Sequence, residues 1–124
     1  MISSGMSASI SLVVTEQDTA IALGSGDVAV LGTPRVVALS EKAAVAALAG
    51  SLPGGATTVG TNITLDHLAA SGVGSGVTAT ATVISVKGKE IIFSVDVSES
   101  DKLIAKGAHT RFVVDRTRFI GSIS

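Results

Sequence analysis

The chain has 124 residues, the length of one domain, so a second independently folded domain is not expected. Its net charge of −1 and its 2% of aromatic residues argue against nucleic-acid binding, which needs a basic surface and stacking rings. The absence of cysteine excludes disulfides, thiolate metal sites and cysteine nucleophiles, and it fits a protein of the reducing cytoplasm.

Hydrophobic residues make up 46% of the chain, and with so few aromatic rings the core must consist of small aliphatic side chains. Each of these buries little area, at about 25 cal/mol per Å² of apolar surface, so association with another copy of the chain is expected to add burial. No apolar run approaches the roughly 18 residues that span a membrane, so no membrane partner is expected.

The region before the first helix predicts a tail, one strand and a loop. Residues 1–6 lack the cationic start and the apolar run of a secretory signal and are expected to form a flexible tail, ahead of a single domain over residues 7–124. Residues 7–14 are β-prone, and residues 19–23 form a second short apolar run. The glycine-rich break at residues 24–27 is typical of a mobile loop.

One long helix is predicted, over residues 34–49. Pro34 suits the first helical position, Thr33 before it can act as the N-cap, and Gly50 just past the last alanine is a common stop. Apolar residues surround this helix on nearly all sides, so we expect it to be buried.

Four strands are predicted after the helix, and in the first three of them apolar and polar residues alternate with period two. They cover residues 57–68, 77–86, 90–97 and 103–114. A tight turn containing Gly88 joins the second and third of them, and the chain has a short polar ending. One early strand, one buried helix and four long strands predict an α+β protein with the hot-dog fold, an antiparallel β-sheet wrapped around one long central helix.

Glu41 is the first candidate for chemistry. At 100° per residue it lies on the helical stripe of Val37 and Leu48, so a carboxylate interrupts an apolar face. Burying a carboxylate is costly unless it finds a donor or a proton, and a carboxylate held in this way suits general-base or nucleophilic work. The structural alternative is a partly exposed residue that pairs with Arg35 or Lys42.

His67 is the second candidate. It is expected to share a strand face, turned toward the helix, with residues at two-residue spacing: Val59, Thr61, Ile63 and Leu65. A histidine at the end of such a face is more often structural than catalytic, since one backbone carbonyl satisfies it.

Thr33 is the third candidate, although an N-cap explains it without any chemistry. A helix N-terminus also offers free N–H groups and a positive dipole end, so its hydroxyl could hold a substrate carbonyl or a water. Thr33 opens the helix, Glu41 lies about two turns further along it, and His67 lies on the sheet face that the helix covers. The three could therefore converge on one cleft, as acyl transfer requires.

Short motifs accompany these residues: LGTP at 31–34, LSE at 39–41, VGT at 59–61, DHLAA at 66–70, GVG at 72–74, GAHTR at 107–111 and VVDR at 113–116. With them, residues 28–119 resemble the fluoroacetyl-CoA thioesterase-like branch of the hot-dog superfamily. In that family a threonine and a glutamate stand eight residues apart and a histidine follows 26 residues later, intervals that Thr33, Glu41 and His67 reproduce.

The resemblance implies a homodimer that hydrolyses an acyl-CoA thioester, with no metal and no cofactor other than the CoA of the substrate. Glu41 would be the nucleophile or the base that activates water, and Thr33 would position Glu41 or the substrate carbonyl. His67 would assist proton transfer and stabilise the tetrahedral intermediate. Gly60 matches a family glycine near the thioester, where the missing side chain lets the backbone approach the acyl group.

The chain also departs from the family. A phenylalanine on a lid-like segment shortly before the threonine has no counterpart here, because residues 21–30 contain no aromatic residue, so selectivity for a fluoroacetyl group is not expected. Arg111 is assigned, with Gly60, to substrate binding, and His109 is assigned a structural role. The candidates for contact with the CoA phosphates, for all of which a solvated surface charge is the alternative, are Lys87, Lys89, Arg111, Arg116 and Arg118.

Two other functions fit the same fold. A hydratase or dehydratase acting on acyl-CoA would call for a different Asp/His motif on the helix, which is absent. A non-catalytic acyl-CoA-binding or assembly domain would keep the fold without turnover, and the intact set of Thr33, Glu41 and His67 argues against it.

Overall fold

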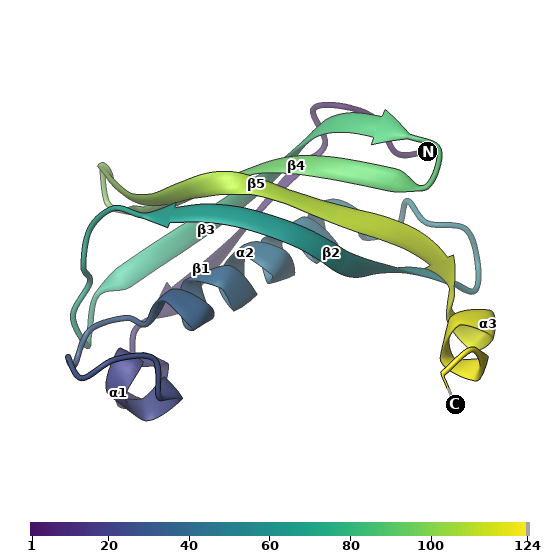
Figure 1. Cartoon of the computed structure of the whole chain (residues 1–124). Helices are drawn as coiled ribbons and strands as arrows, with labels where there is room; N and C mark the ends of the chain where they lie inside the picture. The colour runs from purple at the N-terminus through teal and green to yellow at the C-terminus, as the bar shows by residue number, and fades with distance from the viewer. Residues whose placement is uncertain (124) are drawn as a thin grey trace.

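Five strands form one antiparallel sheet in the computed structural model of the chain, which describes residues 1–123 (Figure 1). Their order across the sheet is β1-β3-β4-β5-β2. They cover Ser7–Val13 (β1), Ala56–His67 (β2), Gly76–Lys87 (β3), Glu90–Glu99 (β4) and Lys102–Asp115 (β5). Every predicted strand is therefore found, with its ends shifted by no more than two residues.

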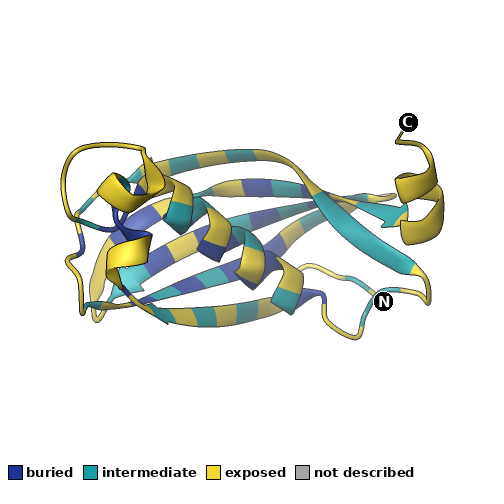
Figure 2. Ribbon diagram, turned by 90° about the horizontal axis from the view of Figure 1, so that it is seen from below, coloured by how far each residue is buried: buried dark blue, intermediate teal, exposed yellow. Residues whose placement is uncertain are grey.

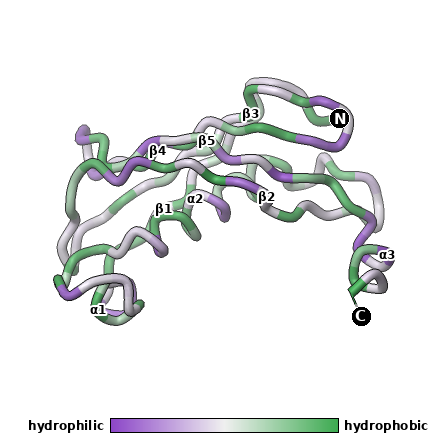
Figure 3. The backbone as a smooth tube through the Cα atoms, viewed as in Figure 1, coloured by the Kyte–Doolittle hydropathy of each residue, from purple (hydrophilic) through white to green (hydrophobic). Residues whose placement is uncertain are grey.

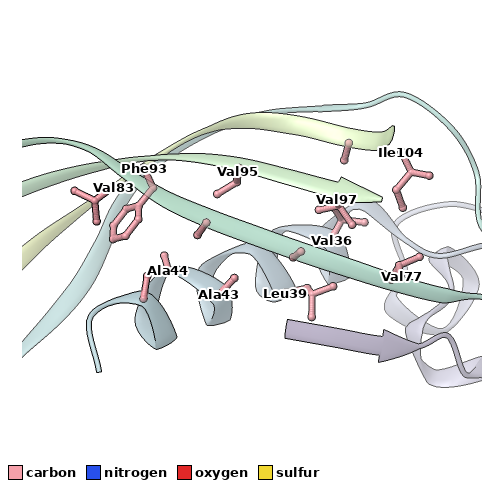
Figure 4. Close-up of a cluster of buried hydrophobic side chains, with 14 of the residues drawn as sticks. Val36, Leu39, Ala43, Ala44, Val77, Val83, Phe93, Val95, Val97 and Ile104 are labelled. Atoms are coloured by element: carbon pink, nitrogen blue, oxygen red, sulfur yellow. The ribbon is translucent and has the colours of Figure 1, made fainter. Parts of the chain in front are cut away.

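The long helix α2 (Thr33–Ala47) crosses the concave face of this sheet and packs mainly against β1 and β3 (Figure 1). Small side chains on its inner side, Ala43 and Ala44, allow close packing under Phe93 and Val95 of β4, and all four are buried (Figure 4). The predicted α+β arrangement, a sheet wrapped around one long helix, is confirmed.

The start of α2 differs from the prediction. Its N-cap is Gly32, with φ −78° and ψ 144°, and Thr33 is already the first helical residue. Pro34 follows in the first turn, where a missing N–H costs nothing. The prediction of Thr33 as N-cap is wrong, because Gly32 has the extended backbone that precedes the helix and the Thr33 hydroxyl is bonded elsewhere.

α2 is buried on one side only (Figure 2). Val36 and Leu39 face the sheet, whereas Ala38 and Lys42 are exposed and Val45 is 50% exposed. The expectation of a helix buried all round is therefore wrong for a single chain. The reason is that the single sheet covers only one side of α2, so the opposite side, although partly apolar, is exposed.

Short helical segments precede α2 and follow β5. The segment η1 (Glu16–Asp18) leads into α1 (Ala20–Leu23), which is capped by the Thr19 hydroxyl and ends at Gly24 with φ 72°. The apolar run at residues 19–23 is thus a helical turn. The polar ending of the chain is also helical, as α3 (Arg116–Gly121).

The segment expected to be a flexible tail, residues 1–6, is hydrogen-bonded to β3. Gly5 N–H donates to the carbonyl of Val83, and Val83 N–H donates to the carbonyl of Met6, both at 2.8 Å. Ile2 packs against the core. These contacts place the segment along the edge of the sheet.

The outer face of the sheet is polar. The hydroxyls of Ser9 and Thr80 lie 2.7 Å apart, and those of Ser11 and Thr78 lie 2.9 Å apart. Hydrophobic and hydrophilic residues alternate along the strands (Figure 3), because successive side chains point to opposite faces. Within residues 1–123, no helix is long and apolar enough to cross a membrane.

Candidate active site

Glu41 lies on the side of α2 that faces β2 and β5. Its Oε1 accepts a hydrogen bond from Nη1 of Arg111 at 3.2 Å and lies 3.8 Å from Nε2 of His109. Its side chain is 39% exposed, so the expectation of a buried carboxylate is wrong. The alternative prediction, a partly exposed Glu41 paired with Arg35 or Lys42, is wrong about the partner. Glu41 pairs with Arg111, while Arg35 pairs with Asp18 at 2.9 Å.

Arg111 is buried, with 7% of its surface exposed, and is therefore not a solvated surface charge. Its Nε donates to Oγ1 of Thr58 at 2.9 Å and its Nη2 donates to the carbonyl of Thr58 at 3.1 Å. Burial lowers the pKa of Arg111, and the neighbouring Glu41 carboxylate opposes this shift. The guanidinium is thus fixed by β2 on one side and holds the Glu41 carboxylate on the other.

His109 of β5 completes this cluster on the face of the sheet that is turned to α2. It is 1% exposed, and its ring stacks on Phe93. Its Nδ1 lies 2.7 Å from the carbonyl oxygen of Asn62, so Nδ1 carries the proton and donates. Its Nε2 then accepts from Nη1 of Arg111 at 3.2 Å. Burial lowers the pKa of His109, an effect that Asn62 and Glu41 oppose and Arg111 reinforces. The assigned structural role fits this position.

A β-bulge decides which residue of β2 faces Glu41. The register between β2 and β5 shifts between Gly60 and Asn62, so Gly60 pairs with Arg111 and lies on the face turned to α2. The simple alternation that placed Thr61 on this face is therefore wrong. A Cβ at Gly60 would lie 2.5 Å from Oε1 of Glu41, so the missing side chain makes room for the carboxylate.

Thr33 and His67 form a second cluster at the N-terminal end of α2. Oγ1 of Thr33 lies 2.8 Å from Nδ1 of His67, so the prediction that His67 faces the helix holds. The other ring nitrogen, Nε2, is buried and has no hydrogen-bond partner in the described part of the chain. An orphaned nitrogen of this kind is available to a ligand.

Separate cavities adjoin the two clusters. The Thr33–His67 pair borders a cavity of about 370 Å³ between α1 and the residues that follow β2. Glu41, Gly60 and His109 border another, of about 300 Å³. No three His, Asp or Glu side chains within residues 1–123 are grouped closely enough to hold a metal ion.

A single chain does not bring Thr33, Glu41 and His67 together, contrary to expectation. Thr33 and Glu41 are eight residues apart on one helix, which separates them by about 12 Å along its axis. His67 bonds to Thr33, while Glu41 bonds to Arg111. The described part of the chain therefore holds these residues in two separate clusters, Thr33 with His67 and Glu41 with Arg111.

The sequence analysis did not identify every residue that holds these two clusters in place. Asn62 contributes through its backbone carbonyl, for which side-chain chemistry gives no signal. Asp18, buried beside Arg35, ties the segment before α1 to α2. Burial raises its pKa, but hydrogen bonds from Thr15 and Arg35 outweigh that effect and lower it. The GAHTR motif was the available signal for His109 and Arg111, whose two-residue spacing puts them on one strand face.

Comparisons with known proteins identify the family of the chain. Residues 14–117 match the family model of the fluoroacetyl-CoA-specific thioesterases. Over 90 residues, 73% of this chain, the sequence is 36% identical to the fluoroacetyl-CoA thioesterase of Streptantibioticus cattleyicolor, and the chain spans 65% of the length of that relative.

Solved structures show the same fold. The structure is similar to that of the fluoroacetyl-CoA thioesterase FlK, with a TM-score of 0.93 and 29% identity over 99% of this chain and 96% of that one. It is also similar to a thioesterase superfamily member from Thermus thermophilus, with a TM-score of 0.90 and 21% identity over 98% of this chain and 90% of that one, a likeness of fold. The hot-dog fold is thus confirmed, and the chain belongs to the family of fluoroacetyl-CoA-specific thioesterases.

Proposed function

We propose that the chain is an acyl-CoA thioesterase, which hydrolyses a thioester to a free acid and CoA, and that a second copy of the chain completes its active site. The observation that carries the proposal is the division of the chemistry between two half-sites, Thr33 with His67 and Glu41 with Arg111. FlK has been solved with acetyl-CoA in one variant and with fluoroacetate and CoA in another, which supports a CoA thioester as the substrate.

Two surfaces support a homodimer. β2 forms one edge of the sheet, and a strand of 12 residues with an open edge is a ready template for another strand. α2 leaves Val45 exposed one turn beyond Glu41. When two β2 strands pair about a two-fold axis, they run antiparallel, so the end that carries His67 lies opposite the half that carries Gly60. Glu41 of one copy then approaches the Thr33–His67 pair of the other.

In the proposed reaction the thioester carbonyl lies beside Thr33 and His67. Glu41 attacks the carbonyl carbon, or removes a proton from a water that attacks it, while Arg111 holds the carboxylate in place. Negative charge then develops on the carbonyl oxygen, where the unpartnered Nε2 of His67, as an N–H donor, and the N–H groups at the start of α2 can stabilise it. The C–S bond breaks, and CoA leaves as the thiol with a proton that comes from the attacking water through Glu41. Where Glu41 itself was the nucleophile, the thiolate takes its proton from water, and a water molecule then hydrolyses the acyl-glutamyl anhydride, which releases the free acid and restores the carboxylate.

We propose further that the enzyme needs no cofactor beyond the CoA of its substrate and works in the cytoplasm. The acid–base and nucleophilic groups named above are sufficient for hydrolysis, and the cysteine-free sequence suits a reducing compartment. A non-catalytic acyl-CoA-binding domain is the competing function that the experiment must separate from this one.

The test measures thiol release by the purified protein from acetyl-, fluoroacetyl-, butyryl-, hexanoyl- and benzoyl-CoA. Hydrolysis of at least one of them is expected, and Glu41→Gln or His67→Ala should lower kcat by about 100-fold or more. Glu99→Gln, at the far end of β4, is the matched control and should retain activity. Binding of CoA without hydrolysis of any thioester, or variants as active as the wild type, would contradict the proposal in favour of a binding domain.

A further inference from the structure

The cavity beside Thr33 and His67 has largely aliphatic side walls, while Ser25, Asp27, Thr33 and His67 provide its polar groups. It holds about 370 Å³. Its side walls come from the region of α1, from the loop that leads to α2, and from the residues that follow β2. The aliphatic side chains that line them include Ala20, Val28, Val30, Leu68, Ala69 and Ala70. Of the described residues that line the cavity, none is aromatic.

The size of this cavity exceeds what a two-carbon acyl group fills. An apolar cavity of about 150 Å³ is large enough to bind benzene, a ring of six carbons. The cavity of about 370 Å³ is open to solvent on one side, and an acetyl or fluoroacetyl group would leave part of its aliphatic lining in contact with water. A longer alkyl chain displaces that water and gains the free energy of burying apolar surface.

The charges at this cavity disfavour an acyl group with a second carboxylate. None of the described lining residues is Lys or Arg, and Asp27 lines the rim together with Ser25. A carboxylate at the end of the acyl chain would lose its hydration without gaining a cation and would face the charge of Asp27. Succinyl and similar groups are therefore poor occupants.

The orphaned Nε2 of His67 fixes the direction of the acyl group. This nitrogen is buried without a partner in the described residues, and its ring is held by Thr33 through Nδ1. A thioester carbonyl oxygen is an acceptor that can satisfy it when it carries the proton. With the carbonyl at His67, the alkyl chain extends along the walls that Val28, Ala69 and Ala70 line.

We infer that this chain selects an uncharged aliphatic acyl group of about four to eight carbons, bound in this cavity with its carbonyl at Thr33 and His67. The inference rests on the proposed thioesterase function and adds the class of acyl group to it.

The test compares kcat/KM for acetyl-, butyryl-, hexanoyl- and succinyl-CoA. The wild type is expected to favour hexanoyl-CoA over acetyl-CoA by at least about tenfold, because apolar contact is gained with each methylene, and to disfavour succinyl-CoA relative to butyryl-CoA. Val28→Phe fills the cavity and should lower the ratio of hexanoyl to acetyl kcat/KM by about tenfold. Ala70→Phe fills it from another wall and provides a second variant if the first does not fold.

Val73→Phe is the matched control. Val73 is 51% exposed, close to the 57% of Val28, but it lies outside this cavity, so its replacement should leave the ratio unchanged. Equal or higher kcat/KM for acetyl- or succinyl-CoA than for hexanoyl-CoA would overturn the inference, as would ratios in the cavity variants that match the control.

Failure of the proposed function has a different signature, because no thioester of the panel is then hydrolysed. In that case calorimetry compares two stable thioethers, ethyl-CoA and hexyl-CoA. Tighter binding of hexyl-CoA, weakened by Val28→Phe and not by Val73→Phe, supports the aliphatic cavity even without turnover. Equal affinities for the two thioethers overturn it.

Discussion

Nε2 of His109 lies 3.2 Å from Nη1 of Arg111, and the same Nη1 lies 3.2 Å from Oε1 of Glu41. Since the Asn62 carbonyl holds the proton on Nδ1, Nε2 of His109 is an acceptor that fixes one edge of the guanidinium. His109 is in this way a positioning residue for Glu41, since it holds the guanidinium that binds the carboxylate.

The first prediction concerns His109. His109→Leu removes the acceptor, frees Arg111 to rotate and should lower kcat by about tenfold with little change in KM, because the carboxylate and not the substrate cavity is disturbed. His109→Gln, which keeps a donor and an acceptor, should recover much of kcat. Equal kcat for the two variants, with both proteins folded, would show that the contact does not position Glu41.

The second prediction is a dependence of stability on pH. Burial lowers the pKa of His109 in the folded protein, whereas an unfolded chain has an ordinary histidine with a pKa of about 6.5. Between the two pKa values, His109 is therefore protonated in the unfolded state and neutral in the folded state. The contribution of neutral His109 to the free energy of unfolding is complete above about pH 6.5. It decreases as the pH falls from there toward the pKa of His109 in the folded protein, by at most about 1.4 kcal/mol per pH unit.

Urea unfolding at pH 7.5 and pH 5.5 measures this effect. His109→Gln lacks the titrating ring, so its loss of stability between the two pH values should be smaller than that of the wild type. The same loss in both would mean that His109 is not the group responsible.

The third prediction concerns the room that Gly60 leaves. Gly60→Ala places a Cβ within 2.5 Å of Oε1 of Glu41, which must push the carboxylate away from Arg111, and kcat should fall by about tenfold or more. Gly76→Ala is the control, because no heavy atom of the described residues lies within 4 Å of a Cβ there. Full activity of Gly60→Ala would contradict the geometry of this half-site.

The fourth prediction separates a catalytic hydroxyl from a helix cap. Thr33→Val removes the hydrogen bond to His67 and should lower kcat by about tenfold or more, whereas Thr33→Ser keeps the hydroxyl and should retain most of kcat. Because Gly32 is the N-cap, Thr33→Val should change the free energy of unfolding by less than about 0.5 kcal/mol. A loss of about 1 kcal/mol with normal kcat would instead indicate a cap.

The sequence predicts the strands and α2 because their signals are local. The alternation along β3 and β4 has one buried and one polar face, and Pro34 marks the start of the helix. The family spacing similarly identifies Thr33, Glu41 and His67 as a set. Pairing across strands is not local, and this is why the bulge at Thr61 and the burial of Arg111 could not be foreseen.

The separation of Thr33 from Glu41 could be predicted from the sequence. Eight residues of helix separate Thr33 from Glu41 by about 12 Å, a distance that excludes direct contact of both with one reacting atom in a single chain. The open side of α2 also favours a second copy of the chain, because Val45 is apolar and exposed there. Both facts become understandable once a second copy is considered.

The most direct test of the account mixes two inactive variants, Glu41→Gln and His67→Ala, co-expressed with different tags. In a dimer with shared sites, each mixed dimer contains one intact site, built from Glu41 of one chain and His67 of the other, so a random mixture should recover about a quarter of wild-type thioesterase activity. Each variant alone should remain inactive. No recovery in purified mixed dimers would contradict a site shared between two copies.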